Sequence, residues 1–247
     1  MVVREWSAGS RPIQLFPVSD ASSSSESAHG PARVFLVDDH PLVREWLASL
    51  IERQSDLSVC GQSEDAATAV QEITRLQPDV VVVDLSLQGQ TGLELIKQLQ
   101  TLLPNPRVLV LSMHDEAFYA ERALRAGALG YVMKRAATTK VIEAIRKVLL
   151  GQLYVSEALA AQMAGKFIGA KASAGKSPVT QLSDREMEVF TLLGQGYETK
   201  RIADELRLSQ KTVQVYCGRI KEKLGLDNAT ALIREAVRSF EEEHRGG

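Results

Sequence analysis

Cysteines and long apolar runs are both scarce in this 247-residue chain. The two cysteines, Cys60 and Cys217, lie far apart in the sequence, so they offer neither a disulfide framework nor zinc-ligand spacing. Such sparse cysteine usage fits a reducing compartment. No apolar run approaches the roughly 18 residues of a membrane-spanning helix. The N-terminus lacks the continuous apolar stretch of a signal peptide. We therefore expect a cytoplasmic protein without membrane contact.

An excess of charge of either sign is also missing. The formal net charge is -2, with 45% hydrophobic and 24% charged residues. This is an ordinary composition for a globular protein, and it supplies enough apolar material for two small cores. Because the overall charge is close to zero, any affinity for nucleic acid must come from a local basic patch.

Polar and small residues dominate three stretches that cannot bury a core. Residues 1–31 end in the Ser-rich segment ASSSSESAHGP and are expected to form a disordered tail. Residues 153–177 are expected to be a linker, with one candidate helix over 156–168 before the small, flexible run GAKASAGKS. Residues 242–247 are a short closing tail. These stretches separate two expected domains, 32–152 and 178–241.

The first expected domain alternates short apolar runs with helical patterns. The runs predict strands at 34–37, 57–60, 80–83, 108–111 and 131–133. The helical patterns cover 40–54, 66–76, 93–102, 116–125 and 139–150. Four consecutive valines at 80–83 are typical of a central parallel strand that is buried on both faces. Five strands alternating with five helices predict an α/β fold with a doubly wound five-stranded parallel sheet, which binds ligands at the carboxyl ends of its strands.

Polar residues stand at the ends of four of these strands. Asp38 and Asp39 follow the first strand, Asp84 the third, Ser112 the fourth and Lys134 the fifth. Each residue alone is also typical of a turn, a helix cap or the surface. Together, however, they would place three carboxylates, a hydroxyl and an ammonium group at one edge of the sheet. Oxygen ligands of this kind favour Mg²⁺, beside which a carboxylate can accept a phosphoryl group.

The segments VFLVDDHPLVR, VVVDLSLQGQTGLELI, VLVLSMHDE and GALGYVMKRA make residues 33–152 resemble the receiver domain of response regulators, a flavodoxin-like fold. The resemblance implies that Asp84 is phosphorylated by a sensor histidine kinase. It implies that Mg²⁺ is held by Asp38, Asp39, Asp84 and the backbone carbonyl of Ser86. It also implies that Ser112 and Lys134 contact the phosphoryl group, and that Tyr131 is an aromatic switch residue coupled to Ser112.

The sequence departs from the receiver pattern at two positions. Gln88 stands where many receivers have proline, and Arg135 stands where proline or aspartate is usual. Neither position supplies a metal ligand, so the departures concern loop shape, partner choice and phosphate lifetime. An alternative class remains open, a small aspartyl-phosphate phosphatase of the haloacid dehalogenase type. That chemistry needs a second acid two residues after the nucleophile, where this chain has Ser86, and steady turnover of an external phosphomonoester would favour it.

Only helical patterns follow Leu182. Ser183 and Glu186 form a capping-box pattern ahead of a helix that ends at Gly194. Further helices are expected over 200–206, from the cap Ser209 to Leu224, and over 229–240, which predicts an all-α four-helix domain. From 207 to 224, five cations and one acid give a charge of 5 − 1 = +4. A short helix, a turn and a longer basic helix indicate a helix-turn-helix, whereas on charge alone a bundle with one solvated basic face is the alternative.

The segment LSDREMEVFTLLGQGYETKRIADELRLSQKTVQVYCGRIKEKLGL resembles the LuxR-type helix-turn-helix of NarL/FixJ regulators. The resemblance implies that residues 211–224 enter the major groove of double-stranded DNA, and that 229–240 is a dimer contact. Phosphates would be contacted by Lys211, Thr212 and Lys223, and base edges would face Gln214, Val215, Gly218 and Arg219. Tyr216 stands where the family often has histidine. The two resemblances together predict a phosphorylation-controlled, homodimerising transcription regulator that catalyses only its own phosphoryl transfer and dephosphorylation.

Overall fold

The structure, a computed structural model, describes residues 30–87, 90–169 and 178–244. The prediction of a disordered tail over 1–31 and that of a flexible run over 169–177 lie almost wholly outside the described residues, as does the departure at Gln88. The fold is that of the unit Pro31–Gly247. Within the described ranges, no helix is long and apolar enough to span a membrane.

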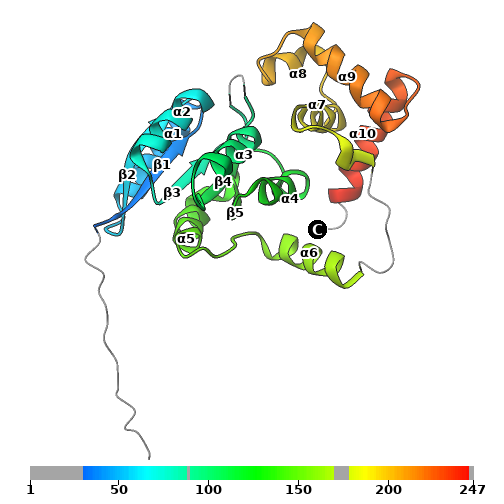
Figure 1. The fold of residues 1–247 in the computed structure, drawn as a ribbon. Coiled ribbons are helices and arrows are strands. Elements are labelled where there is room, and N and C mark those ends of the chain that lie inside the picture. Colours follow the sequence, from blue (N-terminus) through cyan, green and yellow to red (C-terminus); the bar gives the residue numbers. More distant parts are fainter. Residues whose placement is uncertain (1–29, 88–89, 170–177, 245–247) are drawn as a thin grey trace, which may run out of the picture. The chain divides into compact units, whose positions relative to one another are not determined.

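A five-stranded sheet forms the first half of this unit (Figure 1). Its strands are β1 (Ala32–Val37), β2 (Leu57–Ser63), β3 (Val80–Val83), β4 (Val108–Ser112) and β5 (Gly130–Met133). They run parallel in the order β2-β1-β3-β4-β5. The predicted doubly wound parallel sheet is therefore confirmed. The order changes direction between β1 and β3, which places a ligand-binding crevice at the carboxyl ends of these two strands.

The second strand is longer than its apolar residues predicted. β2 continues from Cys60 to Ser63 because its register against β1 shifts at a bulge, after which Gly61 pairs with Phe35 and Ser63 with Val37. As an edge strand, β2 needs an apolar side chain only where it faces the core, so its last residues are small and polar. The backbone pairing, and not the hydrophobic pattern, sets its end.

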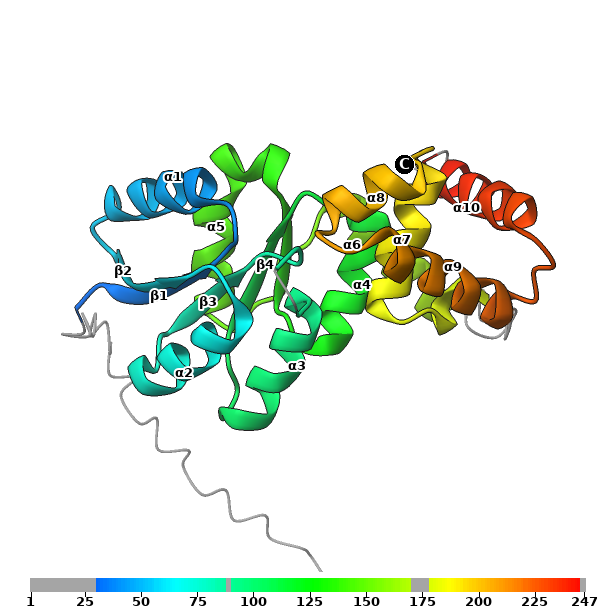
Figure 2. The same ribbon diagram turned by 90° about the horizontal axis from the view of Figure 1, so that it is seen from above.

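Helices cover both faces of the sheet (Figure 2). α1 (Pro41–Glu52) and α5 (Ala137–Leu149) lie on one face, where Leu47, Ile51 and Ile145 pack against the strands. α2 (Ala66–Leu76), α3 (Gly92–Leu102) and α4 (Glu116–Ala126) cover the other face. The predicted helix over 156–168 is present as α6 (Glu157–Gly169).

The C-terminal part is helical, as expected, with α7 (Asp184–Gly194), α8 (Thr199–Glu205), α9 (Gln210–Leu224) and α10 (Ala229–His244). The capping box of Ser183 and Glu186 is formed. Ser209 caps α9, and Gly225 ends it with a φ of 65°, a left-handed conformation that suits glycine. The last helix does not end at Phe240 but continues to His244. The segment EEEH contains no residue that would break it.

Candidate functional site

The carboxylates predicted to meet at the sheet edge do meet there. Asp38 and Asp39 directly follow β1, Asp84 directly follows β3, and all three are buried. Together with His40, each offers one ligand atom, and these atoms lie within 4.8 Å of one another. Three acids in such a volume repel one another strongly unless a cation lies among them.

One cation is supplied by the chain itself. The ammonium group of Lys134, at the end of β5, lies 2.7 Å from Asp38 Oδ2 and 2.7 Å from Asp84 Oδ2. Only 7% of its side chain is exposed. Burial alone would lower the pKa of Lys134, but Asp84 and Asp38 hold it above its ordinary value. Lys134 therefore stays charged and ties the carboxyl ends of three strands together.

Asp84 keeps one carboxylate oxygen free of this ion pair. Its Oδ1 is buried and has no hydrogen-bond partner among the described residues, whereas Oδ2 is held by Lys134. Burial raises the pKa of Asp84 to about 6, with Lys134 opposing and Asp38 adding to the rise. Near neutral pH the free oxygen is therefore mostly an unprotonated, weakly solvated nucleophile.

The same residues fit a divalent metal ion. In the part of the chain that the structure describes, neither Asp84 Oδ1 nor Asp39 Oδ1 has a hydrogen-bond partner, although Asp39 Oδ1 lies 2.7 Å from His40 Nδ1. Buried carboxylate oxygens without partners are costly, and a hard cation such as Mg²⁺ satisfies them. The cluster predicted from the sequence did not include His40. It shares the VDDH segment with the two acids, and this spacing was the available signal.

A glycine allows Asp84 to occupy its position. Gly92 is the first residue of α3, and a Cβ atom there would lie 2.1 Å from the carbonyl oxygen of Asp84. The amide of Gly92 donates to the carbonyl of Leu85 at 2.9 Å. The loop after β3 thus closes tightly onto α3 directly beside the acid.

His114 joins the residues predicted around the phosphoryl group, although the sequence did not single it out. Its Nε2 lies 2.9 Å from the hydroxyl of Ser86, and its backbone amide donates to Ser112 Oγ at 3.3 Å. The hydroxyl of the buried Tyr131 donates to the carbonyl oxygen of His114 at 3.0 Å. Tyr131 and Ser112 are therefore linked through the backbone of His114. The side chain of His114 is neutral, because burial lowers its pKa to about 4, helped by Lys134 and Arg185.

Helix α9 carries the predicted DNA-contacting residues on its accessible side. Val213 and Ile220 are buried against the other helices, while Lys211, Gln214, Val215, Gly218, Arg219 and Lys223 are exposed. Thr212 is half-buried, and its backbone amide and hydroxyl bind the hydroxyl of Ser209 at the start of the helix. The exposed positions recur every three or four residues, which makes one helix face.

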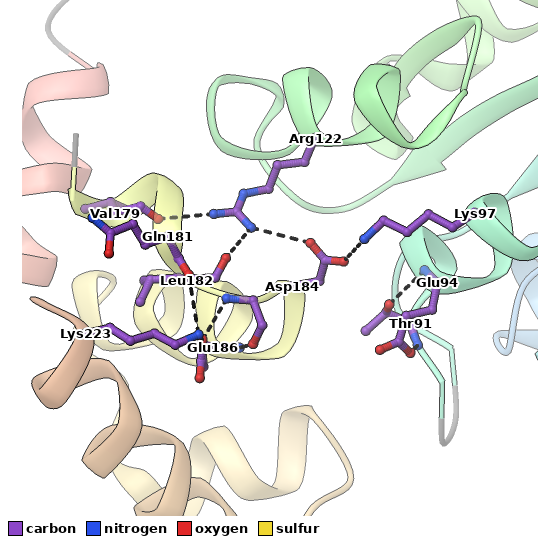
Figure 3. Close-up of polar contacts among 11 residues, drawn as sticks. Thr91, Glu94, Lys97, Arg122, Val179, Gln181, Leu182, Asp184, Glu186 and Lys223 are labelled. Carbon is purple, nitrogen blue, oxygen red and sulfur yellow. Dashed lines mark hydrogen bonds and ion pairs between the residues drawn. The ribbon is translucent and has the colours of Figure 1, made fainter. Parts of the chain in front are cut away.

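Lys223 is engaged within the protein. Its ammonium lies 2.6 Å from Glu186 Oε2 and 3.4 Å from the carbonyl oxygen of Gln181 (Figure 3). The ion pair joins the end of α9 to the capping box of α7. A contact between Lys223 and a DNA phosphate would have to share or replace this partner.

Comparisons with known proteins agree with this geometry. The family model described as "Response regulator receiver domain" matches residues 34–146, and "Bacterial regulatory proteins, luxR family" matches residues 180–236. The "Oxygen regulatory protein NreC" of Staphylococcus carnosus (strain TM300) is 32% identical over 210 residues, which cover 83% of this chain and 97% of NreC. This chain belongs to the response regulators of the NarL/FixJ type. It is a DNA-binding transcription regulator under the control of receiver phosphorylation.

Solved structures of such response regulators extend over both halves of the chain. RcsB from Salmonella enterica serovar Typhimurium, bound to promoter rprA with the phosphomimetic BeF3-, is 26% identical with a TM-score of 0.55. That match covers 83% of this chain and 97% of RcsB. Two RcsB dimers bound to two parallel DNAs match with a TM-score of 0.51, 26% identity and the same coverage.

In this response regulator, polar contacts join the receiver to the DNA-binding domain (Figure 3). The guanidinium of Arg122 on α4 donates to the carbonyl oxygens of Leu182 at 2.9 Å and Val179 at 3.2 Å. The carboxylate of Asp184 lies 2.9 Å from Lys97 Nζ on α3. The sequence offered no signal for these contacts, because they depend on how two separately folded elements pack.

Proposed function

We propose that Asp84 is the phosphoacceptor of this response regulator and that one oxygen of its carboxylate attacks phosphorus. The support is the split environment of the carboxylate, whose Oδ2 is held by Lys134 while Oδ1 has no hydrogen-bond partner within residues 30–87, 90–169 and 178–244. In the transfer, one carboxylate oxygen of Asp84 forms a bond to phosphorus as the bond between phosphorus and the donor breaks. The donor leaves with that electron pair, and Asp84 becomes an acyl phosphate.

We assign Asp38, Asp39 and Asp84 as holders of Mg²⁺, with the backbone carbonyl of Ser86. The metal, when bound, supplies positive charge for the phosphoryl oxygens. Lys134 would bind one phosphoryl oxygen from the position in which it now bridges two acids. Ser112 would donate a hydrogen bond from its hydroxyl to a second phosphoryl oxygen. Tyr131 would move with Ser112, because both contact the backbone of His114.

The DNA-binding domain would read double-stranded DNA with the exposed face of α9. Its assigned contacts are Lys211, Thr212, Gln214, Val215, Gly218, Arg219 and Lys223. The partners we propose are a sensor histidine kinase as the phosphodonor and a second copy of the chain once phosphorylated. The latter is supported by the RcsB dimers on DNA. The domain limits we propose are 32–152 and 178–244, the second extended from 241 because α10 continues to His244; residues 153–177 join them, and residues 1–31 form a tail.

We further propose that the chain has no catalysis beyond its own phosphoryl transfer and dephosphorylation, and that it works in the cytoplasm. Ser86 supports the first proposal, since it stands where a phosphatase of the dehalogenase type needs its second acid. Steady hydrolysis of an external phosphomonoester would contradict it.

A phosphorylation assay tests the site assignment. The full chain, incubated with Mg²⁺ and a small acyl phosphate, should gain one phosphoryl group by intact-mass spectrometry. Asp84→Asn should gain none, because an amide oxygen is a poor nucleophile. Asp56→Asn is the matched control, since Asp56 is an exposed acid paired with Arg146, and it should be phosphorylated like the wild type. Equal phosphorylation of Asp84→Asn would refute the assignment.

A further inference from the structure

An arginine of the DNA-binding domain reaches into the acidic site of the receiver. Nη1 of Arg207 lies 2.9 Å from Asp39 Oδ2. Arg207 stands in the turn between α8 and α9 with a φ of 52°, a left-handed backbone conformation. The amide of the following residue, Leu208, donates to the carbonyl oxygen of Ala203 at 2.8 Å and helps to hold this turn. The arginine is thus presented by the turn that positions the recognition helix.

The ion pair lies at a cavity of about 290 Å³ that both domains line. The receiver contributes Asp39, His40, Asp84, Ser86 and His114 to its wall. The DNA-binding domain contributes Arg185, Tyr197 and Arg207. The carboxylate predicted to accept the phosphoryl group therefore opens into a space that the helix-turn-helix partly encloses.

The two oxygens of Asp39 have different neighbours. Oδ1 lies 2.7 Å from the ring of His40, which belongs to the receiver, whereas Oδ2 is held by Arg207. In the same cluster, Asp38 Oδ2 and Asp84 Oδ2 are held by Lys134. Of these three acids, Asp39 is thus the one with an ion pair to the DNA-binding domain. Arg207 supplies positive charge at a carboxylate that would otherwise face a metal ion.

We propose that Arg207 is an internal counter-ion of the phosphoacceptor site, and that its contact with Asp39 competes with the binding of Mg²⁺. This inference rests on the proposed function, because it needs Asp39 to be a metal ligand. Arg207 must release Asp39, or share it, for that carboxylate to join the coordination of a divalent cation. The closed contact between the domains is therefore favoured in the metal-free protein.

A reciprocal coupling follows. If the metal weakens the contact that holds the helix-turn-helix against the receiver, it raises the affinity for any ligand that draws the helix-turn-helix away. That ligand must then raise the affinity for the metal by the same factor. DNA is such a ligand if one of its phosphates pairs with Arg207, three residues before α9, in place of Asp39. Mg²⁺ and DNA should each raise the affinity of the chain for the other, even without phosphorylation.

The test is a calorimetric titration of Mg²⁺ into the unphosphorylated, DNA-free full chain. Arg207→Gln should bind Mg²⁺ about two- to fivefold more tightly than the wild type, the range expected when a partly exposed ion pair is removed. Arg201→Gln is the matched control. It removes one positive charge from the neighbouring helix α8, where Arg201 stacks on Tyr197 at 3.8 Å. This control should bind Mg²⁺ like the wild type.

Three results would overturn the inference, and they distinguish the counter-ion role from the metal assignment. If the wild type binds Mg²⁺ and Arg207→Gln binds it with the same constant, the counter-ion role is wrong while the metal assignment stands. The same holds if Arg201→Gln tightens binding as much as Arg207→Gln does, since the effect would then be one of net charge. If the wild type binds no Mg²⁺, the metal assignment fails and the inference fails with it.

Discussion

Arg122 and Leu182 are hydrogen-bonded across the two domains, with 2.9 Å between the guanidinium nitrogen Nη1 and the carbonyl oxygen. Arg122 lies on α4, which follows the loop that begins after Ser112, the last residue of β4, and that carries His114. The ring of His114 stacks on that of Tyr119, also on α4, at 4.4 Å. A displacement of this loop on phosphorylation can therefore reach α4, and through Arg122 the segment that leads into α7. This chain of contacts is a physical route from the acid site to the DNA-binding domain.

Removal of Arg122 should weaken the contact between the domains. We expect Arg122→Gln to raise the DNA affinity of the unphosphorylated full chain up to about tenfold, because in a larger fraction of the molecules the DNA-binding domain would be free of the receiver and able to dimerise on DNA. The measurement is fluorescence anisotropy with a DNA site selected from random sequences. Arg125→Gln, on an exposed part of the same helix and paired with Glu121, should leave the affinity unchanged.

Phosphorylation gives the complementary result for Arg122. The wild type should bind DNA more tightly once phosphorylated, and Arg122→Gln should show a smaller gain because part of the contact is already lost. An equal DNA affinity of the unphosphorylated wild type and Arg122→Gln would show that this contact does not restrain DNA binding.

The glycine beside the phosphoacceptor should not tolerate a side chain. Gly92→Ala would force its Cβ against the carbonyl oxygen of Asp84, so the loop must shift. We expect a loss of about 2 kcal/mol or more in the free energy of unfolding, together with slower phosphorylation. Urea denaturation and the phosphodonor assay measure the two effects. Gly165→Ala, in α6 with open space around its Cα, should be as stable as the wild type or slightly more so. Unchanged stability of Gly92→Ala would contradict the close approach.

Glu188 should make stability depend on pH. It is buried on α7, and burial raises its pKa to about 7 against the effect of its partner Arg185, 2.7 Å away. Between its ordinary pKa and about 7, the folded chain holds the proton while the unfolded chain releases it. The free energy of unfolding therefore falls as pH rises through this window, by no more than about 3 kcal/mol, and is level above it.

Glu188→Gln isolates this contribution. In urea denaturation, the free energy of unfolding of the wild type should fall between pH 5 and pH 8. The fall should be smaller in the variant. Other buried acids, Asp84 among them, change with pH in both proteins, so the difference between the two curves is the quantity to compare. Parallel curves would mean that Glu188 is charged throughout.

Two substitutions on α9 should separate affinity from sequence preference. Lys211→Ala should weaken binding to all DNA sequences and lower the salt slope by about one unit, because a phosphate contact carries no base information. Lys211 is a cleaner choice than Lys223, whose removal would also leave Glu186 without its ion pair. Gln214→Ala should instead change the preferred site, since glutamine can pair with an adenine edge. Binding selections at two salt concentrations distinguish these outcomes, and a site preference altered by Lys211→Ala would refute its assignment.

Local patterns in the sequence determined most of the fold and the candidate acid cluster. Short apolar runs and period-3.6 hydrophobicity, with caps such as Ser183 and Ser209, depend on neighbours along the chain, so the strands and helices could be predicted. The parallel sheet then requires that Asp38 and Asp84 meet, because the carboxyl ends of parallel strands share one edge. Strand pairing across a bulge, which extends β2 to Ser63, has no such local signal.

Only the tertiary structure decided which residues from distant parts of the chain complete the site. In the sequence, nothing distinguishes His114 from an ordinary loop residue. It links Ser86 and Tyr131 because the ends of β3 and β4 are adjacent in the sheet. Gly92 is required by a close approach to the Asp84 backbone. In the sequence Arg207 is only one cation of a basic segment, and its position 2.9 Å from Asp39 follows from the packing of one domain on another. Such contacts depend on the complementarity of whole surfaces, which no spacing of residues along the chain encodes.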